Sequence, residues 1–171
     1  IFCAYELIHA KKDLKVLMIE KGRRIENREC PKRKTKVCVG CKPCSITTGF
    51  AGAGAFSDGK LSLSPDVGGN LPEILGYDKT VELLKESDDI YLKFGADSKV
   101  YGVDKEKEIR EIRRKAIMAN LKLIECPIRH LGTEEGYKIY SRLQEHLLEE
   151  GVEMEFGTMV KDIIIEDNQV K

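Results

Sequence analysis

A glycine-rich segment with polar side chains at its end, residues 49–61, is the first part of the sequence that suggests chemistry. Closely spaced glycines leave backbone N–H groups unshielded and allow dihedral angles closed to other residues. A hydroxyl, a carboxylate in a tight turn and a positive charge follow them. This combination favours binding of an anion, phosphate above all, and the alternative is a surface turn without a ligand. The residues concerned are Gly49, Gly52, Gly54, Ser57, Asp58 and Lys60.

Four of the six cysteines are concentrated in residues 30–44, with the spacing C-x7-C-x2-C-x2-C. Repeated C-x2-C pairs in a loop are typical of tetrahedral zinc or of an iron–sulfur cluster. A redox dithiol and plain free thiols are the two alternatives. Neighbouring lysines and arginines would favour the thiolate form under each interpretation. The four residues are Cys30, Cys38, Cys41 and Cys44.

Composition limits the classes of function. The 171 residues are 42% apolar, enough for one domain with a core, and 29 basic residues balance 29 acidic ones. The absence of a net charge argues against nucleic acid as a partner. Apolar runs are far shorter than the roughly 20 residues of a membrane span, so no membrane partner and a cytoplasmic location are expected. Because the chain starts at Ile1 in mid-pattern, we interpret it as a fragment.

The first elements resemble half of a βαβ unit. Residues 1–12 have the wide apolar surface of a helix that lies on a sheet. Residues 15–20 are an apolar run that predicts a parallel strand covered on both faces. Glu20 ends this strand, where nucleotide-binding sheets keep the carboxylate that accepts ribose hydroxyls, about 20 residues after a glycine-rich turn. That turn would precede Ile1, and the carboxylate favours an FAD-type or NAD-type ribose over NADP.

The remaining chain alternates helix and strand signals. Residues 21–45 have no apolar period and predict a basic loop. His130 could meet substrate, although a histidine in a loop is more often a structural hydrogen-bonding group. A turn-rich segment is expected at 61–72, and helices are expected at 79–94 and 105–120. A third helix is expected to start at Thr133, beside Glu134 and Glu135, and to run amphipathically over 137–150. Strands are expected at 121–126, 152–156 and 158–166, with a hairpin turn at Asp167-Asn168.

Several of these segments together resemble one family. VLMIEKG at 16–22, GAGAFSDGKL at 52–61, RHLGT at 129–133 and VEMEFGTMVKDIII at 152–165 are similar to the uncharacterised FAD-dependent dehydrogenases. These are flavoproteins with two dinucleotide-binding domains. The resemblance spans nearly the whole chain, and GAGAFSDGKL is its most specific part.

The resemblance implies that FAD is the cofactor and assigns residues to it. Glu20 would bind the adenosine ribose, with Lys21 nearby, and the backbone of Val160 would contact adenine. The pyrophosphate and flavin would be lined by Gly52, Ala53, Gly54, Ser57, Asp58, Gly59 and Lys60. The resemblance assigns no catalytic residue, no metal ligand and no role to His130.

The expected fold class is α/β, with an incomplete Rossmann-like FAD-binding domain built on a parallel sheet with helices. Residues 1–71, with the cysteine-rich loop 28–45, and residues 132–171 would form it, and residues 72–131 would be a mostly helical part of an inserted α+β substrate-side region. The implied function is an FAD-dependent oxidoreductase that takes a hydride from NAD(P)H or an organic donor and passes it to a small-molecule substrate or electron acceptor. The alternative is a non-catalytic nucleotide- and zinc-binding module that uses Cys30 to Cys44.

Overall fold

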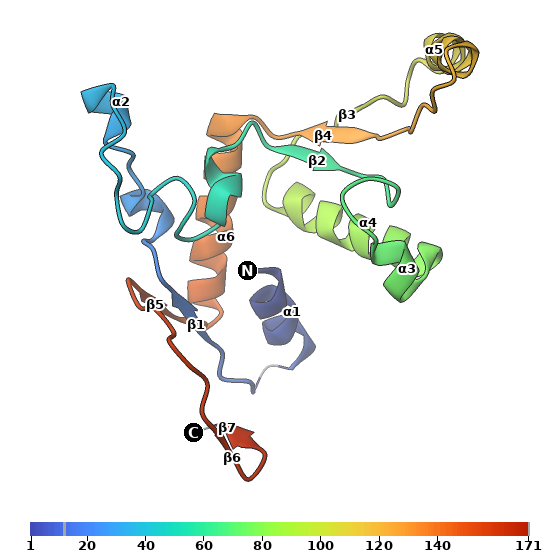
Figure 1. Cartoon of the computed structure of the whole chain (residues 1–171). Helices are drawn as coiled ribbons and strands as arrows, with labels where there is room; N and C mark the ends of the chain where they lie inside the picture. Colours follow the sequence, from blue (N-terminus) through green and yellow to red (C-terminus); the bar gives the residue numbers. More distant parts are fainter. Residues whose placement is uncertain (12, 171) are drawn as a thin grey trace. The chain divides into compact units, whose positions relative to one another are not determined.

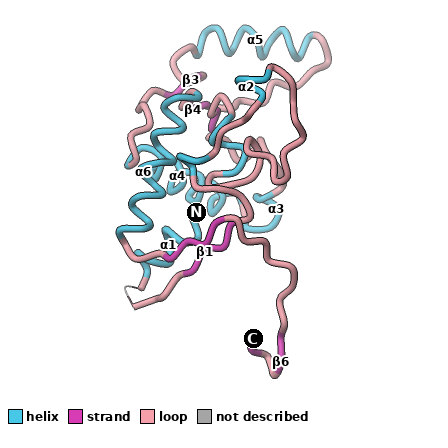
Figure 2. The backbone as a smooth tube through the Cα atoms, turned by 90° about the vertical axis from the view of Figure 1, so that its left-hand side faces the viewer, coloured by secondary structure: helices cyan, strands magenta, loops and turns pink. Residues whose placement is uncertain are grey.

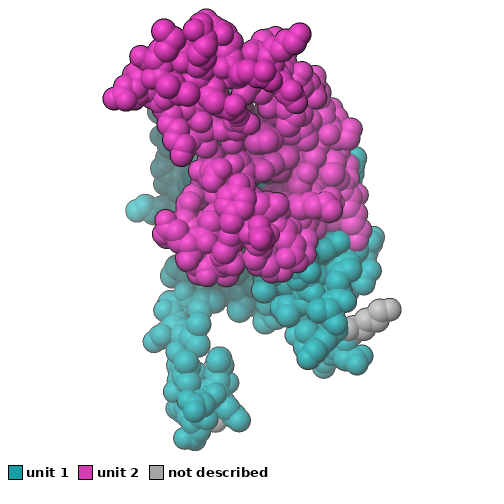
Figure 3. Space-filling model, turned by 90° about the vertical axis from the view of Figure 1, so that its right-hand side faces the viewer, with its two compact units in different colours: residues 1–56, 140–171 teal, residues 57–139 magenta. Residues whose placement is uncertain are grey.

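The computed structural model describes residues 1–11 and 13–170, so the last predicted residue of the first helix, Lys12, lies outside the described residues. Helices alternate with short strands, and the chain is of the mixed α/β class (Figure 1). It divides into two compact units, residues 1–56 with 140–171 and residues 57–139 (Figure 3). The expected insertion, 72–131, falls inside the second unit. In the described ranges, no helix combines the length and the hydropathy needed to cross a bilayer.

A parallel pair of strands belongs to the first unit. β1 (Leu17–Glu20) pairs with β5 (Glu153–Phe156), with Leu17 opposite Glu153 and Glu20 opposite Phe156. Both strands were predicted, but β1 is not covered on both faces: Leu17 is 52% exposed and Ile19 44%. In this two-stranded sheet alternate side chains point to opposite faces, and the face with Leu17 and Ile19 stays open to solvent.

Two helices supply most of the apolar core of the first unit. α1 (Phe2–Ala10) confirms the predicted N-terminal helix, and α6 (Thr133–Glu149) begins at Thr133, the predicted helix start. Gly132 and Thr133 precede two acidic residues, which favour a helix N-terminus there. The buried apolar side chains of this unit are Ala4, Tyr5, Ile25, Phe50, Ala55, Tyr140, Leu143, Leu147 and Val152.

The basic segment 21–45 is mostly irregular, as predicted, with two short turns of helix. They are η1 (Ile25–Asn27) and α2 (Lys32–Thr35). Gln144 of α6, which is 2% exposed, holds η1. Its side-chain oxygen accepts from the Ile25 N–H at 3.1 Å, and its nitrogen donates to the Glu26 carboxylate at 2.9 Å. One buried amide therefore fixes the chain directly after β1.

The C-terminal residues form an extended segment and a hairpin. β6 (Ile165–Glu166) and β7 (Gln169–Val170) are joined by Asp167 and Asn168, both with positive φ, which confirms the predicted turn. The strand predicted over 158–166 is wrong for 158–164, which is loop in Figure 2. Apolar β-branched residues are not sufficient for a strand, because within the described residues no neighbouring strand pairs with 158–164.

The second unit contains a small antiparallel sheet and three helices. The sheet order is β2 (Lys60–Ser62), β4 (Ile128–His130), β3 (Val100–Tyr101). The strand predicted at 121–126 is wrong, because the pairing residues are 128–130, after Pro127. Short α3 (Leu71–Leu75) precedes α4 (Tyr77–Lys93) and α5 (Glu106–Met118), and the latter two confirm the predicted helices.

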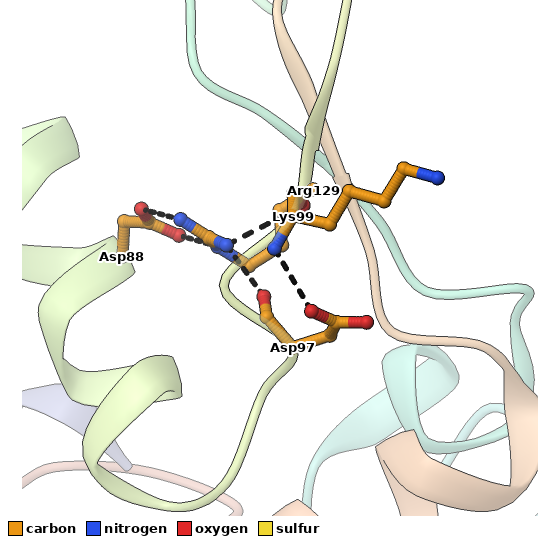
Figure 4. Close-up of polar contacts among 4 residues, drawn as sticks. All are labelled: Asp88, Asp97, Lys99 and Arg129. Carbon is orange, nitrogen blue, oxygen red and sulfur yellow. Dashed lines mark hydrogen bonds and ion pairs between the residues drawn. The ribbon is translucent and has the colours of Figure 1, made fainter.

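A buried ion pair joins β4 to α4. The Arg129 side chain is 4% exposed and donates to both oxygens of the Asp88 carboxylate, at 2.5 and 2.7 Å (Figure 4). It also donates to the Asp97 carbonyl at 2.5 Å, while the Asp97 carboxylate accepts from the Lys99 N–H at 2.9 Å. The hydrogen bonds to Asp88 raise the pKa of Arg129. This cluster holds the strand that carries His130.

Candidate functional site

Glu20 lies at the carboxyl end of the parallel strand pair. Its Oε1 accepts a hydrogen bond from the Gly22 N–H at 2.7 Å, and Oε2 accepts none from the described residues. Beyond the strands the pairing continues, because the Thr158 N–H donates to the Glu20 carbonyl at 3.1 Å and the Gly157 N–H to the Gly22 carbonyl at 2.8 Å. In open α/β sheets, ligands bind outside the carboxyl ends of parallel strands. Glu20 therefore lies at the carboxyl end of the strand pair, with one carboxylate oxygen bonded to the backbone.

The glycine-rich segment begins directly beside this strand end. Arg23 and Gly49 form a parallel β-bridge, and the Phe50 N–H donates to the Arg23 carbonyl at 3.0 Å. A Cβ on Gly22 would lie 2.4 Å from the Gly49 nitrogen, so the two backbones meet in a way that only glycine allows. The structure thus brings the end of β1 and the start of the glycine-rich segment together.

An open hollow of about 600 Å³ lies at the carboxyl ends of β1 and β5. The guanidinium of Arg24 lies 6.0 Å from the centre of the Phe156 ring in its wall. Its polar wall and aromatic ring suit a heterocycle with hydroxyl groups. Glu20 and Gly52 to Gly54 are not among its lining residues. These are Gly22, Arg23, Arg24, Glu26, Asn27, Glu29, Phe156 and Gly157.

The middle of the glycine-rich segment is a helical turn instead of an open loop. Residues Gly52–Phe56 form the 3₁₀ helix η2. Gly52 has the positive φ that was expected, at 54°, but Gly54 does not. A Cβ on Gly54 would lie 3.1 Å from the Tyr140 hydroxyl oxygen, so this glycine is explained by close packing on α6. Ala53 is exposed on the same turn.

The polar end of the segment belongs to the second unit. Ser57 Oγ accepts from the Gly59 N–H at 3.1 Å, and the Lys60 ammonium lies 2.8 Å from the Asp58 carboxylate. The hydrogen bond from Lys60 holds the pKa of Asp58 below its ordinary value. The β2–β4 register places Lys60 directly opposite His130. The antiparallel pairing thus joins two candidates that the sequence analysis treated separately.

Arg28 is a buried arginine near the candidate site that the sequence did not single out. It is 5% exposed and donates to the carbonyls of Ser45, Ile46 and Phe50, at 3.0, 2.8 and 2.5 Å. Its guanidinium carbon lies 4.7 Å from the centre of the Phe56 ring. Burial lowers the pKa of Arg28. Because it stands among many exposed lysines and arginines in 21–45, no sequence signal separated it from them.

The cysteine-rich loop contains free thiols. Cys30 and Cys41 are half-buried, and Cys38 and Cys44 are exposed. Within residues 1–11 and 13–170, no group of three or more histidine, cysteine or carboxylate side chains is arranged to hold a metal ion. The structure therefore does not gather the four cysteines into one site.

Two predicted cofactor contacts are not among the residues that line the hollow. Lys21 is exposed in the bend after β1. Val160 is 55% exposed, four residues beyond β5, and is not in a strand. The prediction that Val160 belongs to the strand after the helix is therefore wrong, because that strand ends at Phe156.

The chain matches no protein-family model and no curated protein.

Proposed function

We propose that this chain is a Rossmann-like nucleotide-binding part of an FAD-dependent oxidoreductase. The observation that carries the proposal is the contact between Gly22 and Gly49 beside Glu20 at the carboxyl ends of two parallel strands. A ribose-binding carboxylate and a glycine-rich backbone are the parts that a dinucleotide requires of its site. Here they are neighbours within one compact unit.

Two features at the carboxyl end of β1 would hold the adenosine half of the cofactor: Glu20, and the hollow that begins at Gly22. The hollow of about 600 Å³ is within the usual range of ligand sites. Glu20 Oε2, which accepts no bond from the described residues, would accept a ribose hydroxyl, and the backbone near Gly49 and Gly52 would approach the phosphates. FAD, when bound, would transfer a hydride or electrons between a donor such as NAD(P)H and a small-molecule acceptor.

Within the second unit, the polar groups Ser57, Asp58 and Lys60 follow the glycine-rich segment along the chain. The Lys60 ammonium would stabilise negative charge on a reduced flavin. Asp58 fixes this ammonium through the ion pair at 2.8 Å. The opposing His130 would be a hydrogen-bonding group on the same strand pair.

Binding of FAD and FMN to the purified chain tests the proposal, because FMN lacks the adenosine that Glu20 would hold. Quenching of flavin fluorescence gives both affinities. We expect FAD to bind more tightly than FMN, and Glu20→Gln to weaken FAD binding about tenfold or more through loss of a charge-assisted hydrogen bond. The same substitution should leave FMN binding unchanged.

Glu155→Gln is the matched control, since Glu155 is an exposed carboxylate on the neighbouring strand β5. It should leave both affinities unchanged. Equal affinity for FAD and FMN, or equal effects of the two substitutions on FAD, would contradict the proposed site.

A further inference from the structure

Two cysteines in the basic segment 21–45 of the first unit offer thiol chemistry that is separate from nucleotide binding. Cys41 and Cys44 stand on either side of a bend at Lys42 and Pro43. Both are free thiols, and both are at least partly accessible. Three peptide units separate their Cα atoms, a short span that lets a bent loop reach disulfide geometry.

The turn that follows Cys44 favours its thiolate. Hydrogen bonding from the backbone of Ile46 and from the backbone and hydroxyl of Thr47 lowers the pKa of the Cys44 thiol. The turn that presents them is closed by the N–H groups of Thr47 and Thr48, which donate to the Cys44 carbonyl at 3.2 and 2.9 Å. Donors aimed at a sulfur stabilise the thiolate, which is the reactive form.

Arg28 holds this turn from the buried side. Its bonds to the carbonyls of Ser45 and Ile46 fix the two residues that follow Cys44. Its charge adds to the stabilisation of a Cys44 thiolate. The arrangement combines an accessible sulfur in an electropositive environment with a second thiol three residues away, which is the pattern of a dithiol that reacts with disulfides.

We propose that Cys41 and Cys44 form a thiol–disulfide exchange site whose substrate is the disulfide of a low-molecular-weight thiol. The Cys44 thiolate attacks one sulfur of that disulfide, forms a mixed disulfide and releases one thiolate, which takes up a proton. The Cys41 thiolate then attacks Cys44 Sγ, forms the Cys41–Cys44 disulfide and releases the second thiol. The two cysteines are oxidised by two electrons, and the small disulfide is reduced by two.

Oxidised glutathione is the probe, added to the folded full chain, with peptide mapping by mass spectrometry as the readout. We expect the wild type to form a Cys41–Cys44 disulfide with loss of two hydrogens. Cys41→Ser should accumulate the mixed disulfide on Cys44. Cys44→Ser should slow the uptake of glutathione by this loop about tenfold or more, since it removes the attacking thiolate.

Cys38→Ser is the matched control, because Cys38 is exposed in the same loop. It should form the Cys41–Cys44 disulfide at the wild-type rate. Circular dichroism before the reaction confirms that each variant is folded. A different pairing, such as Cys30 with Cys44, would overturn the proposal, as would a wild type that reacts only after a chelator removes zinc. This test involves no flavin, so its failure is separate from failure of the proposed function.

Discussion

Arg129 and Asp88 form a two-point ion pair between β4 and α4, with an arginine side chain that is 4% exposed. Both carboxylate oxygens are occupied, and the remaining guanidinium donors reach the Asp97 carbonyl. Arg129→Met would leave the Asp88 carboxylate, only 13% exposed, without its partner. Removal of one partner from a buried pair lowers the free energy of unfolding by about 3–5 kcal/mol. Urea denaturation of the chain measures this change.

The exposed pair Lys138–Glu135 in α6 is the control for that prediction. Lys138→Met should change the free energy of unfolding by less than about 0.5 kcal/mol, as is usual for solvated helix pairs. Comparable effects of the two substitutions would show that Arg129 has no special structural role.

The contact between Gly22 and Gly49 makes a second prediction. Gly22→Ala would place a Cβ 2.4 Å from backbone, and the strand end would have to move. We expect a decrease of about 1–3 kcal/mol in the free energy of unfolding. Gly136→Ala, in α6 with no atom within 4 Å of the added Cβ, should instead stabilise the chain by up to about 1 kcal/mol. If Gly22→Ala is also neutral or stabilising, the close contact is wrong.

The lowered pKa of Cys44 makes both the stability of the folded chain and the reactivity of this thiol depend on pH. Because folding lowers this pKa, the thiolate form adds stability to the folded chain above the ordinary cysteine pKa, and that contribution is lost as the pH falls through the folded value. Alkylation of Cys44 by iodoacetamide should therefore reach half its maximal rate at a lower pH in the folded chain than in urea.

Thr47→Val removes one of the donors to Cys44 and should move this midpoint to higher pH. Thr35→Val, a matched change elsewhere in the loop, should leave it in place, because Thr35 Oγ1 donates to the carbonyls of Pro31 and Val37. Identical midpoints in the folded and unfolded chains would mean that the turn does not stabilise the thiolate.

The ion pair of Lys60 makes a prediction that is independent of flavin. Lys60→Ala removes the hydrogen bond that lowers the pKa of Asp58, so that pKa should rise toward its ordinary value. Carboxyl carbon NMR over a pH series measures it, and Lys122→Ala is the control at an exposed lysine of the same unit. In flavin-loaded protein, Lys60→Ala should also lower the flavin reduction potential. An unchanged Asp58 pKa would show that the pair is not formed in solution.

The helices and strands whose apolar side chains recur at a regular spacing could be predicted from the sequence. Residues 79–94 and 105–120 alternate apolar and charged side chains at helical spacing, and both helices are confirmed. The parallel strands 17–20 and 153–156 were found because each is a short apolar or alternating run beside a helix. The strands at 100–101 and 128–130 were not predicted, since two or three residues are too few for a pattern and their pairing depends on partners far away in the sequence.

The sequence identified several residues of the candidate site, but it did not predict which of them are in contact. Glu20 was identified from its position at a strand end, and that position is confirmed. The role of Gly54 in packing on Tyr140, and the pairing of Lys60 with His130, depend on tertiary contacts that no local spacing encodes. Arg28 is the clearest case, because its burial depends on three carbonyl groups 17 to 22 residues away.

Arg28 also connects the turn after Cys44 to the start of the glycine-rich segment. Its guanidinium donates to the carbonyls of Ser45 and Ile46, which follow Cys44, and to the carbonyl of Phe50. Phe50 follows Gly49, the glycine that contacts the chain at the end of β1. We therefore expect a change of charge at the sulfur to affect the backbone near Gly49 through the guanidinium of Arg28. If both proposals hold, oxidation of Cys44 would change the affinity for the nucleotide, and Arg28 would be the side chain that links them.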